Sequence, residues 1–110
     1  MAVVKKSKIT IDVGLDENRV PETLNWEASD SWMDAAESPV VFVSVWDKDA
    51  KQALRIDLWT KEMMMHEMQL FFVQNFHSMA DTYERSTSDE DGAKKIRAFA
   101  KEFETEVFKD

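Results

Sequence analysis

The sequence predicts an α+β fold, in which a four-stranded antiparallel sheet is followed by two C-terminal helices packed on one face of that sheet. Between about residues 8 and 59, apolar and polar side chains alternate in short runs, which is typical of strands. From about residue 64 onward, apolar residues recur at spacings of three and four, which is typical of helices. We therefore expect a single domain over residues 1–110, with strands within about 8–59 and helices at about 64–85 and 89–108.

The first two strands are expected to form a hairpin. Residues 16–19 are polar and turn-like, and Pro21 suits the start of a strand because it has no N–H to donate. Apolar residues alternate with polar ones on both sides of this turn: Ile9, Ile11, Val13 and Leu15 before it, and Leu24, Trp26 and Ala28 after it.

Residues 29–39 are too polar for a strand, and Ser31 followed by Asp34 could cap one short helical turn. The next run, VVFVSVW at residues 40–46, is almost continuously apolar, which predicts a central strand covered on both faces. A polar turn follows. The fourth strand then alternates Leu54, Ile56 and Leu58 on one face with Arg55, Asp57 and Trp59 on the other.

The C-terminal half predicts two amphipathic helices. The first is apolar around much of its circumference, with one stripe formed by Met65, Met68, Phe72, Phe76, Met79 and Tyr83. Ser88 followed by Asp91 matches a capping box for the second helix. The apolar stripe of that helix contains Ala93, Ile96, Ala100, Phe103 and Val107. The wide apolar surface of the first helix, or an open sheet edge, suggests that the chain forms a homo-oligomer.

The run MMMHEM at residues 63–68 raises the question of a metal site. Copper(I) needs several soft ligands that converge on one point, but Met64 and Met68 lie on a different helix face from Glu62 and His66. The two histidines are three turns apart, about 16 Å along a helix, and cannot share an ion. We therefore expect no metal. The methionines are better explained by packing where the last strand meets the first helix, with an adaptable contact surface as the alternative.

Composition argues against several other functions. The formal charge of −8 opposes binding to DNA or RNA, which requires clustered Lys and Arg. With only two glycines the chain cannot form a glycine-rich phosphate loop, and with no cysteine it has no thiol nucleophile. No window is long and apolar enough for a membrane span, and no secretory signal is recognisable. We expect a cytoplasmic protein with no cofactor, no catalytic residues and no enzymatic activity.

Four tryptophans in so short a chain favour contact surfaces, because exposed aromatic residues often anchor protein interfaces. Trp59 falls on the polar side of the fourth strand, where packing against a helix end is the favoured explanation. For Trp32, in the acidic excursion, anchoring a partner and folding back over its neighbours are equally supported. The candidate partner surface comprises Arg19, Trp32, Asp57 and Trp59.

Several blocks of the sequence resemble the gliding motility protein GldC family of Bacteroidetes. They are LDENRVPE at residues 15–22 followed by Trp26, VWD at 45–47, LRIDLWTKEM at 54–63, and MADTY at 79–83. Glu67-Met68 and Phe71-Phe72 extend the likeness between the last two blocks. The blocks span most of the chain in order, whereas the ends and residues 29–39 depart from the pattern.

The resemblance implies a small soluble accessory protein of gliding, with protein partners in the gliding or secretion apparatus and no assigned catalytic residues. The expected layout is also similar to that of the export chaperone SecB, although no motif is shared. A SecB-like chaperone or adaptor, which holds or delivers components of the secretion or gliding machinery, is therefore the alternative. Either protein would act through contacts, for example by adding an extended segment to a sheet edge or a groove.

Overall fold

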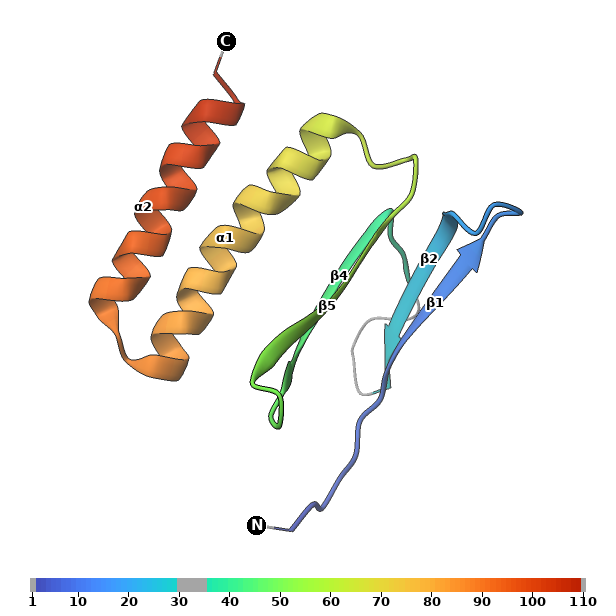
Figure 1. Cartoon of the computed structure of the whole chain (residues 1–110), viewed down its shortest axis with the longest axis horizontal. Helices are drawn as coiled ribbons and strands as arrows, with labels where there is room; N and C mark the ends of the chain where they lie inside the picture. Colours follow the sequence, from blue (N-terminus) through green and yellow to red (C-terminus); the bar gives the residue numbers. More distant parts are fainter. Residues whose placement is uncertain (1, 30–35, 110) are drawn as a thin grey trace. The chain divides into compact units, whose positions relative to one another are not determined.

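The computed structural model describes residues 2–29 and 36–109 (Figure 1). The chain divides into two compact units, Met1–Met63 and Met64–Asp110, which we name the strand unit and the helical unit. Strands come first and two helices follow, as the α+β prediction requires. The packing of the helices on a sheet face, and the grouping of both units in one domain, stay predictions.

The strand unit contains two antiparallel sheets. The first has the order β1-β2-β3, formed by Ile9–Leu15, Pro21–Ala28 and Ala36–Glu37. The second is a hairpin of β4, Val40–Asp47, and β5, Gln52–Trp59. The predicted single sheet of four strands is therefore wrong, since the described residues form five strands that are divided between two sheets.

The division into two sheets follows from the pairing of β2. One edge of β2 pairs with β1, and on the other edge Asn25 and Trp26 pair with the short strand β3. β5 contacts β2 as well, but it forms no ladder with it. Ala36 and Glu37 belong to the segment whose polarity argued against a strand. That expectation was wrong because strand pairing depends on backbone groups, whereas side-chain polarity affects mainly burial.

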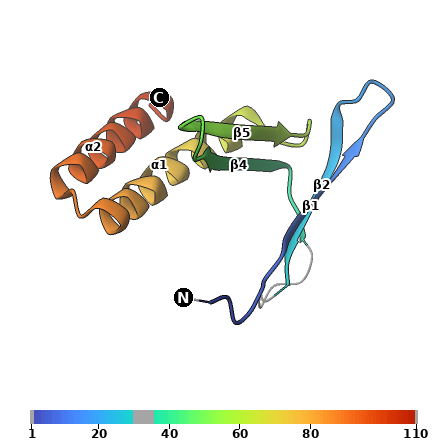
Figure 2. The same ribbon diagram turned by 60° about the horizontal axis from the view of Figure 1, so that its bottom comes forward.

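The apolar run of β4 also differs from its prediction. It forms an edge strand of a two-stranded sheet rather than a central strand, and Val45 and Trp46 remain 56% and 64% exposed. The register with β5 places six aliphatic side chains on one side of the hairpin, which we name the aliphatic face: Val41, Val43, Val45, Leu54, Ile56 and Leu58. Figure 2 shows the two strands of this hairpin one above the other.

The helical unit is an antiparallel pair, α1 at Met65–Thr87 and α2 at Glu90–Val107 (Figure 2). Between them, Ser88 adopts a left-handed conformation with φ 60° and ends α1, its N–H donating to the Glu84 carbonyl. The N-cap of α2 is therefore Asp89, whose carboxylate accepts from the Gly92 N–H at 3.0 Å. The predicted capping box at Ser88 was wrong by one residue, because Ser88 already terminates the preceding helix.

The contact between the helices is built on small residues. Val73, Ala80, Ala93 and Ala100 are the buried hydrophobic residues of the described part of this unit. Small side chains at a helix crossing let the two backbones approach closely. The methionines at the start of α1 contribute little to this core, since Met64 and Met65 are 56% and 78% exposed.

Larger and charged side chains flank this contact on two different sides. On one side, Phe76 makes edge-on contacts with Phe99 and Phe103, with ring centroids 5.4 Å apart in both pairs. On the other side, Arg97 donates to Asp81 and Glu84. Successive residues of a helix are separated by about 100°, so the two sides of the pair differ in character. One is aromatic, and the other is held by ion pairs.

Candidate protein-contact site

The strand unit has a groove where the start of β2 approaches the end of β5. It has a volume of about 310 Å³ and is lined by Val20, Pro21, Asp57, Leu58 and Trp59. Four of these five side chains are apolar, and Trp59 is 55% exposed. The groove therefore offers a large aromatic surface that the strand unit leaves accessible.

The turn between β1 and β2 positions one wall of the groove. One carboxylate oxygen of Asp16 accepts from the backbone N–H groups of Asn18 and Val20, at 2.8 and 3.0 Å. The Asp16 carbonyl also accepts from the Arg19 N–H, and Arg19 adopts a left-handed conformation with φ 62°. These bonds hold Val20 at the rim and leave the Arg19 side chain exposed beside it.

The β5 wall carries an organised charge pair. Arg55 donates to both carboxylate oxygens of Asp57, at 2.9 and 3.3 Å, and its guanidinium carbon lies 5.6 Å from the centroid of the Phe42 ring. Register places all three side chains on the same face of the hairpin as Trp59. This arrangement orients the carboxylate of Asp57, although an ion pair this exposed contributes little to stability.

The backbone of β5 adds hydrogen-bonding groups to the groove. The Thr60 N–H donates to the Pro39 carbonyl at 2.9 Å, so these residues form a hydrogen-bonded pair at the end of the hairpin. Bonded and non-bonded pairs alternate along an antiparallel ladder, so Asp57 and Trp59 direct their N–H and C=O groups away from β4. No strand within residues 2–29 or 36–109 pairs with this edge of β5.

The groove suits an extended peptide segment, because it combines apolar walls, one oriented carboxylate and outward backbone groups. Such a segment gains affinity from main-chain hydrogen bonds and specificity from side chains that enter pockets. The lining of the groove contains one ionisable side chain, that of Asp57, beside four apolar ones.

The structure brings together three of the four residues of the predicted partner surface. Asp57 and Trp59 line the groove, and Arg19 directly precedes Val20 at its rim. Trp32 lies outside the described residues. Sequence reasoning missed Val20, Pro21 and Leu58. The proline at a strand start was a usable signal, but the approach of β2 to β5 could not be read from the chain.

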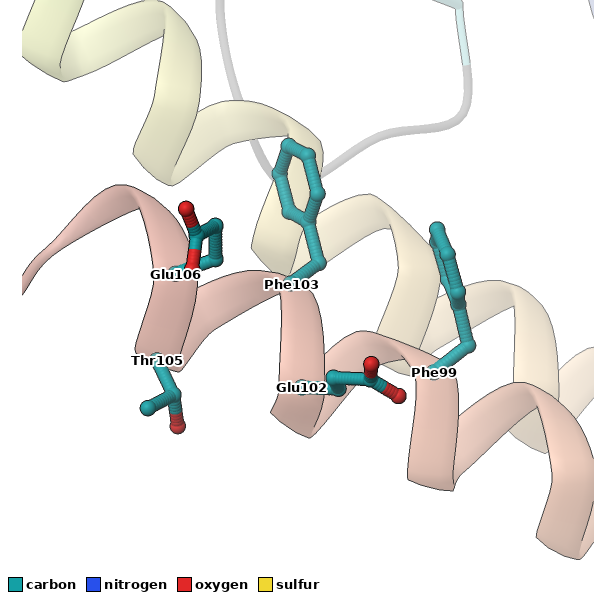
Figure 3. Close-up of a pocket in the computed structure, with 5 residues that line it drawn as sticks. All are labelled: Phe99, Glu102, Phe103, Thr105 and Glu106. Carbon is teal, nitrogen blue, oxygen red and sulfur yellow. The ribbon is translucent and has the colours of Figure 1, made fainter.

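A second hollow, of about 570 Å³, lies on the helical unit (Figure 3). Phe99 and Phe103 project from α2 toward α1, while Thr105 points away from them. All the lining residues belong to the last turns of α2: Phe99, Glu102, Phe103, Thr105 and Glu106. Although this hollow is larger, a single helix forms its lining, whereas segments from two sheets line the β5 groove, so the β5 groove is the better candidate.

Three pKa shifts occur at structural positions of the helical unit. A hydrogen bond from the Tyr83 hydroxyl to Asp89, 2.7 Å long, lowers the pKa of the Asp89 carboxyl and raises that of the tyrosine. Hydrogen bonds to Asp81, and then to Glu84, raise the pKa of Arg97. All three groups serve a helix cap or the ion pairs between α1 and α2, and they indicate no proton-transfer site.

Within residues 2–29 and 36–109, no group of three His, Asp or Glu side chains is arranged to hold a metal ion. Neither of the two helices in that part of the chain combines the length and apolar character needed to cross a membrane.

Fold and groove define a small α+β protein whose candidate site is an open contact surface between two β-sheets. The chain belongs to the family of GldC-like, gliding motility-associated proteins, whose family model matches residues 21–109. The match includes β2, β5 and both helices, and therefore most of the groove. No curated protein and no solved structure gave a significant match.

Proposed function

We propose that this chain is a cytoplasmic, non-enzymatic accessory protein of bacterial gliding motility that acts through protein–protein contacts. Membership of the GldC-like family supports the process. The groove at Val20, Pro21, Asp57, Leu58 and Trp59 is the observation that supports the mode of action. In this proposal an extended segment of a partner from the gliding or secretion apparatus adds to β5 and places an apolar side chain against Trp59.

In this proposal, each part of the groove contributes differently to binding the partner. Trp59 supplies the buried area of the contact, because large aromatic residues dominate interface energetics. The outward N–H and C=O groups of Asp57 and Trp59 bind the partner's backbone. Arg19 and Asp57 carry opposite charges at the rim, where they favour one orientation of the partner and affect its rate of association.

The test is a crosslinking pull-down from a gliding bacterium that carries the tagged chain, read by mass spectrometry. Trp59→Ala is the test variant and Trp46→Ala the matched control, since Trp46 is similarly exposed at the opposite end of the same hairpin face. We expect a short set of motility proteins with the wild type and the control. Loss of a hot-spot tryptophan weakens binding by about 2 kcal/mol or more, roughly thirtyfold.

Equal capture by Trp59→Ala and Trp46→Ala would remove the groove from the proposal. Capture of no motility protein by the wild type would remove the proposed function itself. Arg19→Ala and Asp57→Asn are expected to weaken binding less than Trp59→Ala does, because charges at the rim of an interface contribute modestly.

The alternative function, a SecB-like chaperone or adaptor, is supported by a different observation. On the aliphatic face, Val45, Leu54 and Ile56 are each about half exposed. Exposed apolar surface of this kind suits unfolded clients. Suppression of the aggregation of heat-denatured luciferase by the purified chain, lost in Ile56→Ser and retained in Trp59→Ala, would favour this alternative. No suppression by the wild type would remove it.

A further inference from the structure

The N-terminal segment, residues 2–8, differs in charge from the rest of the chain. It contains three lysines, Lys5, Lys6 and Lys8, and no acidic residue. Subtracting these three positive charges from the net charge of −8 leaves −11 for residues 9–110. The segment forms no helix or strand before β1, and Val3 and Val4 are 73% and 97% exposed. It therefore presents apolar and basic side chains in a chain that is otherwise strongly acidic.

Hydrogen bonds at Lys8 determine where this segment leaves β1. The Lys8 N–H donates to the Ser29 hydroxyl at 2.8 Å, and the Lys8 carbonyl accepts from the Ser29 N–H at 2.9 Å, so the pairing of β1 with β2 continues to Lys8. The groove lies at the other end of that pair, where Leu15 is the partner of Pro21. Figure 2 shows the segment leaving β1 at the end away from the β1–β2 turn.

Distance prevents the segment from reaching the groove of its own copy. From Lys8 to Leu15 the strand spans about 23 Å, at roughly 3.3 Å per residue. Lys6 is two residues from Lys8, so their Cα atoms are at most about 7 Å apart. Lys6 therefore cannot meet Asp57 of the same chain, and any contact between the two requires a second copy.

The spacing of the segment matches that of the groove. Val4 and Lys6 are two residues apart, so their side chains lie on the same face when the segment is extended. Trp59 and Asp57 are likewise two residues apart on one face of β5, and both line the groove. In one antiparallel register Val4 lies opposite Trp59 while Lys6 lies opposite Asp57. The apolar side chain then meets the aromatic wall, and the ammonium group meets the carboxylate.

The groove can accept a positive charge. Arg55 donates two hydrogen bonds to the Asp57 carboxylate, whose two oxygens can accept about four, so capacity remains for a lysine. At the rim, the exposed side chains of Glu17 and Glu22 outnumber that of Arg19. The side chains around the entrance are therefore acidic on balance.

We propose that residues 2–7 of one copy bind as an added antiparallel strand in the β5 groove of a second copy, with Val4 against Trp59 and Lys6 against Asp57. The outward N–H and C=O groups of Asp57 and Trp59 bind the backbone of the segment. The two valines favour the extended conformation that this contact requires.

Charge favours a second copy as the occupant, although two copies of net charge −8 repel each other as whole molecules. At physiological ionic strength, interactions between exposed charges are screened beyond about 8 Å. The sign of the contact is therefore decided by the lysines of the segment and the carboxylates at the groove, which attract each other.

The inference rests on the proposed function, in which this groove binds a partner of the gliding or secretion apparatus, and it adds a regulator of that site. The segment of a second copy and the partner's segment compete for the same backbone groups of β5. Self-association and partner binding therefore exclude each other at each groove.

The test measures the molar mass of the purified full chain by sedimentation equilibrium across a wide range of concentrations. We expect the mass to rise from 12.8 kDa to at least twice that value. Lys6→Glu places a carboxylate opposite Asp57 and should weaken association at least about tenfold. Lys48→Glu, in the exposed turn between β4 and β5, is the matched control, because it changes the net charge equally and should associate like the wild type.

Reversal of both charges tests whether the two residues meet. Asp57→Lys should weaken association by a similar factor. Combining it with Lys6→Glu should restore association to near the wild-type level, because opposite charges face each other again. Circular dichroism of each variant checks that the fold is retained.

A wild type that stays monomeric at every concentration would overturn the proposal. Equal association of Lys6→Glu and Lys48→Glu, or a double variant as weak as the single ones, would also overturn it. Because the measurement contains no partner protein, none of these results changes the expected capture of motility proteins. Failure of that capture would in turn leave the measured molar mass unaffected.

Discussion

The strand unit and the helical unit expose different kinds of groups. In the helical unit each backbone group away from the helix ends is bonded within its own helix, so the exposed surface consists of side chains. In the strand unit, Asp57 and Trp59 also present backbone N–H and C=O groups at the edge of β5, with which no other described strand than β4 pairs. The comparison shows why a binding segment that uses main-chain hydrogen bonds must be sought at the strands, although the larger hollow lies on α2.

The cores of the two units differ as well. Among the described residues, the strand unit completely buries the large side chain of Leu24, whereas the helical unit buries small ones such as Ala80 and Ala100. The strand unit should therefore lose stability when a buried side chain is made smaller, and the helical unit when a buried side chain is made larger. Five substitutions, each with its expected effect on stability, test this contrast and the turns before β2 and α2.

The largest effect is expected from Leu24→Ala. It removes a fully buried side chain and leaves a cavity, which should lower the free energy of unfolding by about 3 kcal/mol. Urea denaturation followed by tryptophan fluorescence measures the change. Val13→Ala is the control, since Val13 lies opposite Leu24 on β1 but is 38% exposed. Equal losses in the two variants would contradict the assignment of Leu24 to the core.

Ala100→Leu should have the next largest effect, a loss of about 2 kcal/mol, because the added volume forces α1 and α2 apart. Ala98→Leu is the matched control on the exposed side of the same helix and should change the free energy of unfolding by less than about 0.5 kcal/mol. Segment-resolved hydrogen exchange should locate the loss in the helical unit. A tolerated Ala100→Leu would show that the helix contact is loose.

Asp89→Ala removes the N-cap of α2 and the acceptor of the Tyr83 hydroxyl, and should lower the melting temperature by several degrees. The pKa of Asp89 is lowered from its ordinary value of 3.8. Its contribution to stability is therefore complete above about pH 4 and is lost as pH falls through the lower pKa of the folded state. The melting temperatures of wild type and variant should converge in strong acid.

The control for this prediction is Glu90→Ala, which removes a carboxylate from the first turn of α2 without removing the cap. It should cause a smaller loss of melting temperature than Asp89→Ala does. An unchanged difference between the wild type and Asp89→Ala from neutral to strongly acidic pH would show that the Asp89 carboxylate does not stabilise the folded state.

The smallest effect is expected from glycine at the left-handed positions. Ser88 and Arg19 have φ values of 60° and 62°, a conformation that costs residues with a Cβ roughly 1 kcal/mol. Ser88→Gly and Arg19→Gly should each raise the free energy of unfolding by about 0.5 kcal/mol. The gain is smaller than the relieved cost because glycine has more conformational freedom to lose from the unfolded chain. Thermal denaturation measures both. A loss of stability at either position would mean that its side chain stabilises the turn.

Much of the secondary structure could be predicted from the sequence. The alternation of β1 and β5 and the helical spacing of α1 and α2 depend on local periodicity, and the structure has strands and helices there. The boundary between α1 and α2 was missed by one residue because Ser88 and Asp89 are both good caps. Only backbone conformation distinguishes the residue that ends one helix from the residue that begins the next.

The candidate site was predictable in part. Arg19, Asp57 and Trp59 were selected as polar or aromatic residues away from the expected core, and they meet at one groove. Val20, Pro21 and Leu58 were not selected, because an apolar residue near a strand end is equally suited to a core. Their role depends on how closely β2 approaches β5, which local patterns do not encode.

By itself, the sequence determined the types and order of all the described elements except β3, the acidic charge, and membership of the GldC-like family over residues 21–109. Only the tertiary structure decided that β3 pairs with β2, that the described strands form two sheets, and that β4 and β5 pair with no third strand of the described residues. The physical reason is the range of the interactions. Periodicity reflects which face of an element is apolar, whereas strand pairing is a competition among backbone groups that every sequence shares.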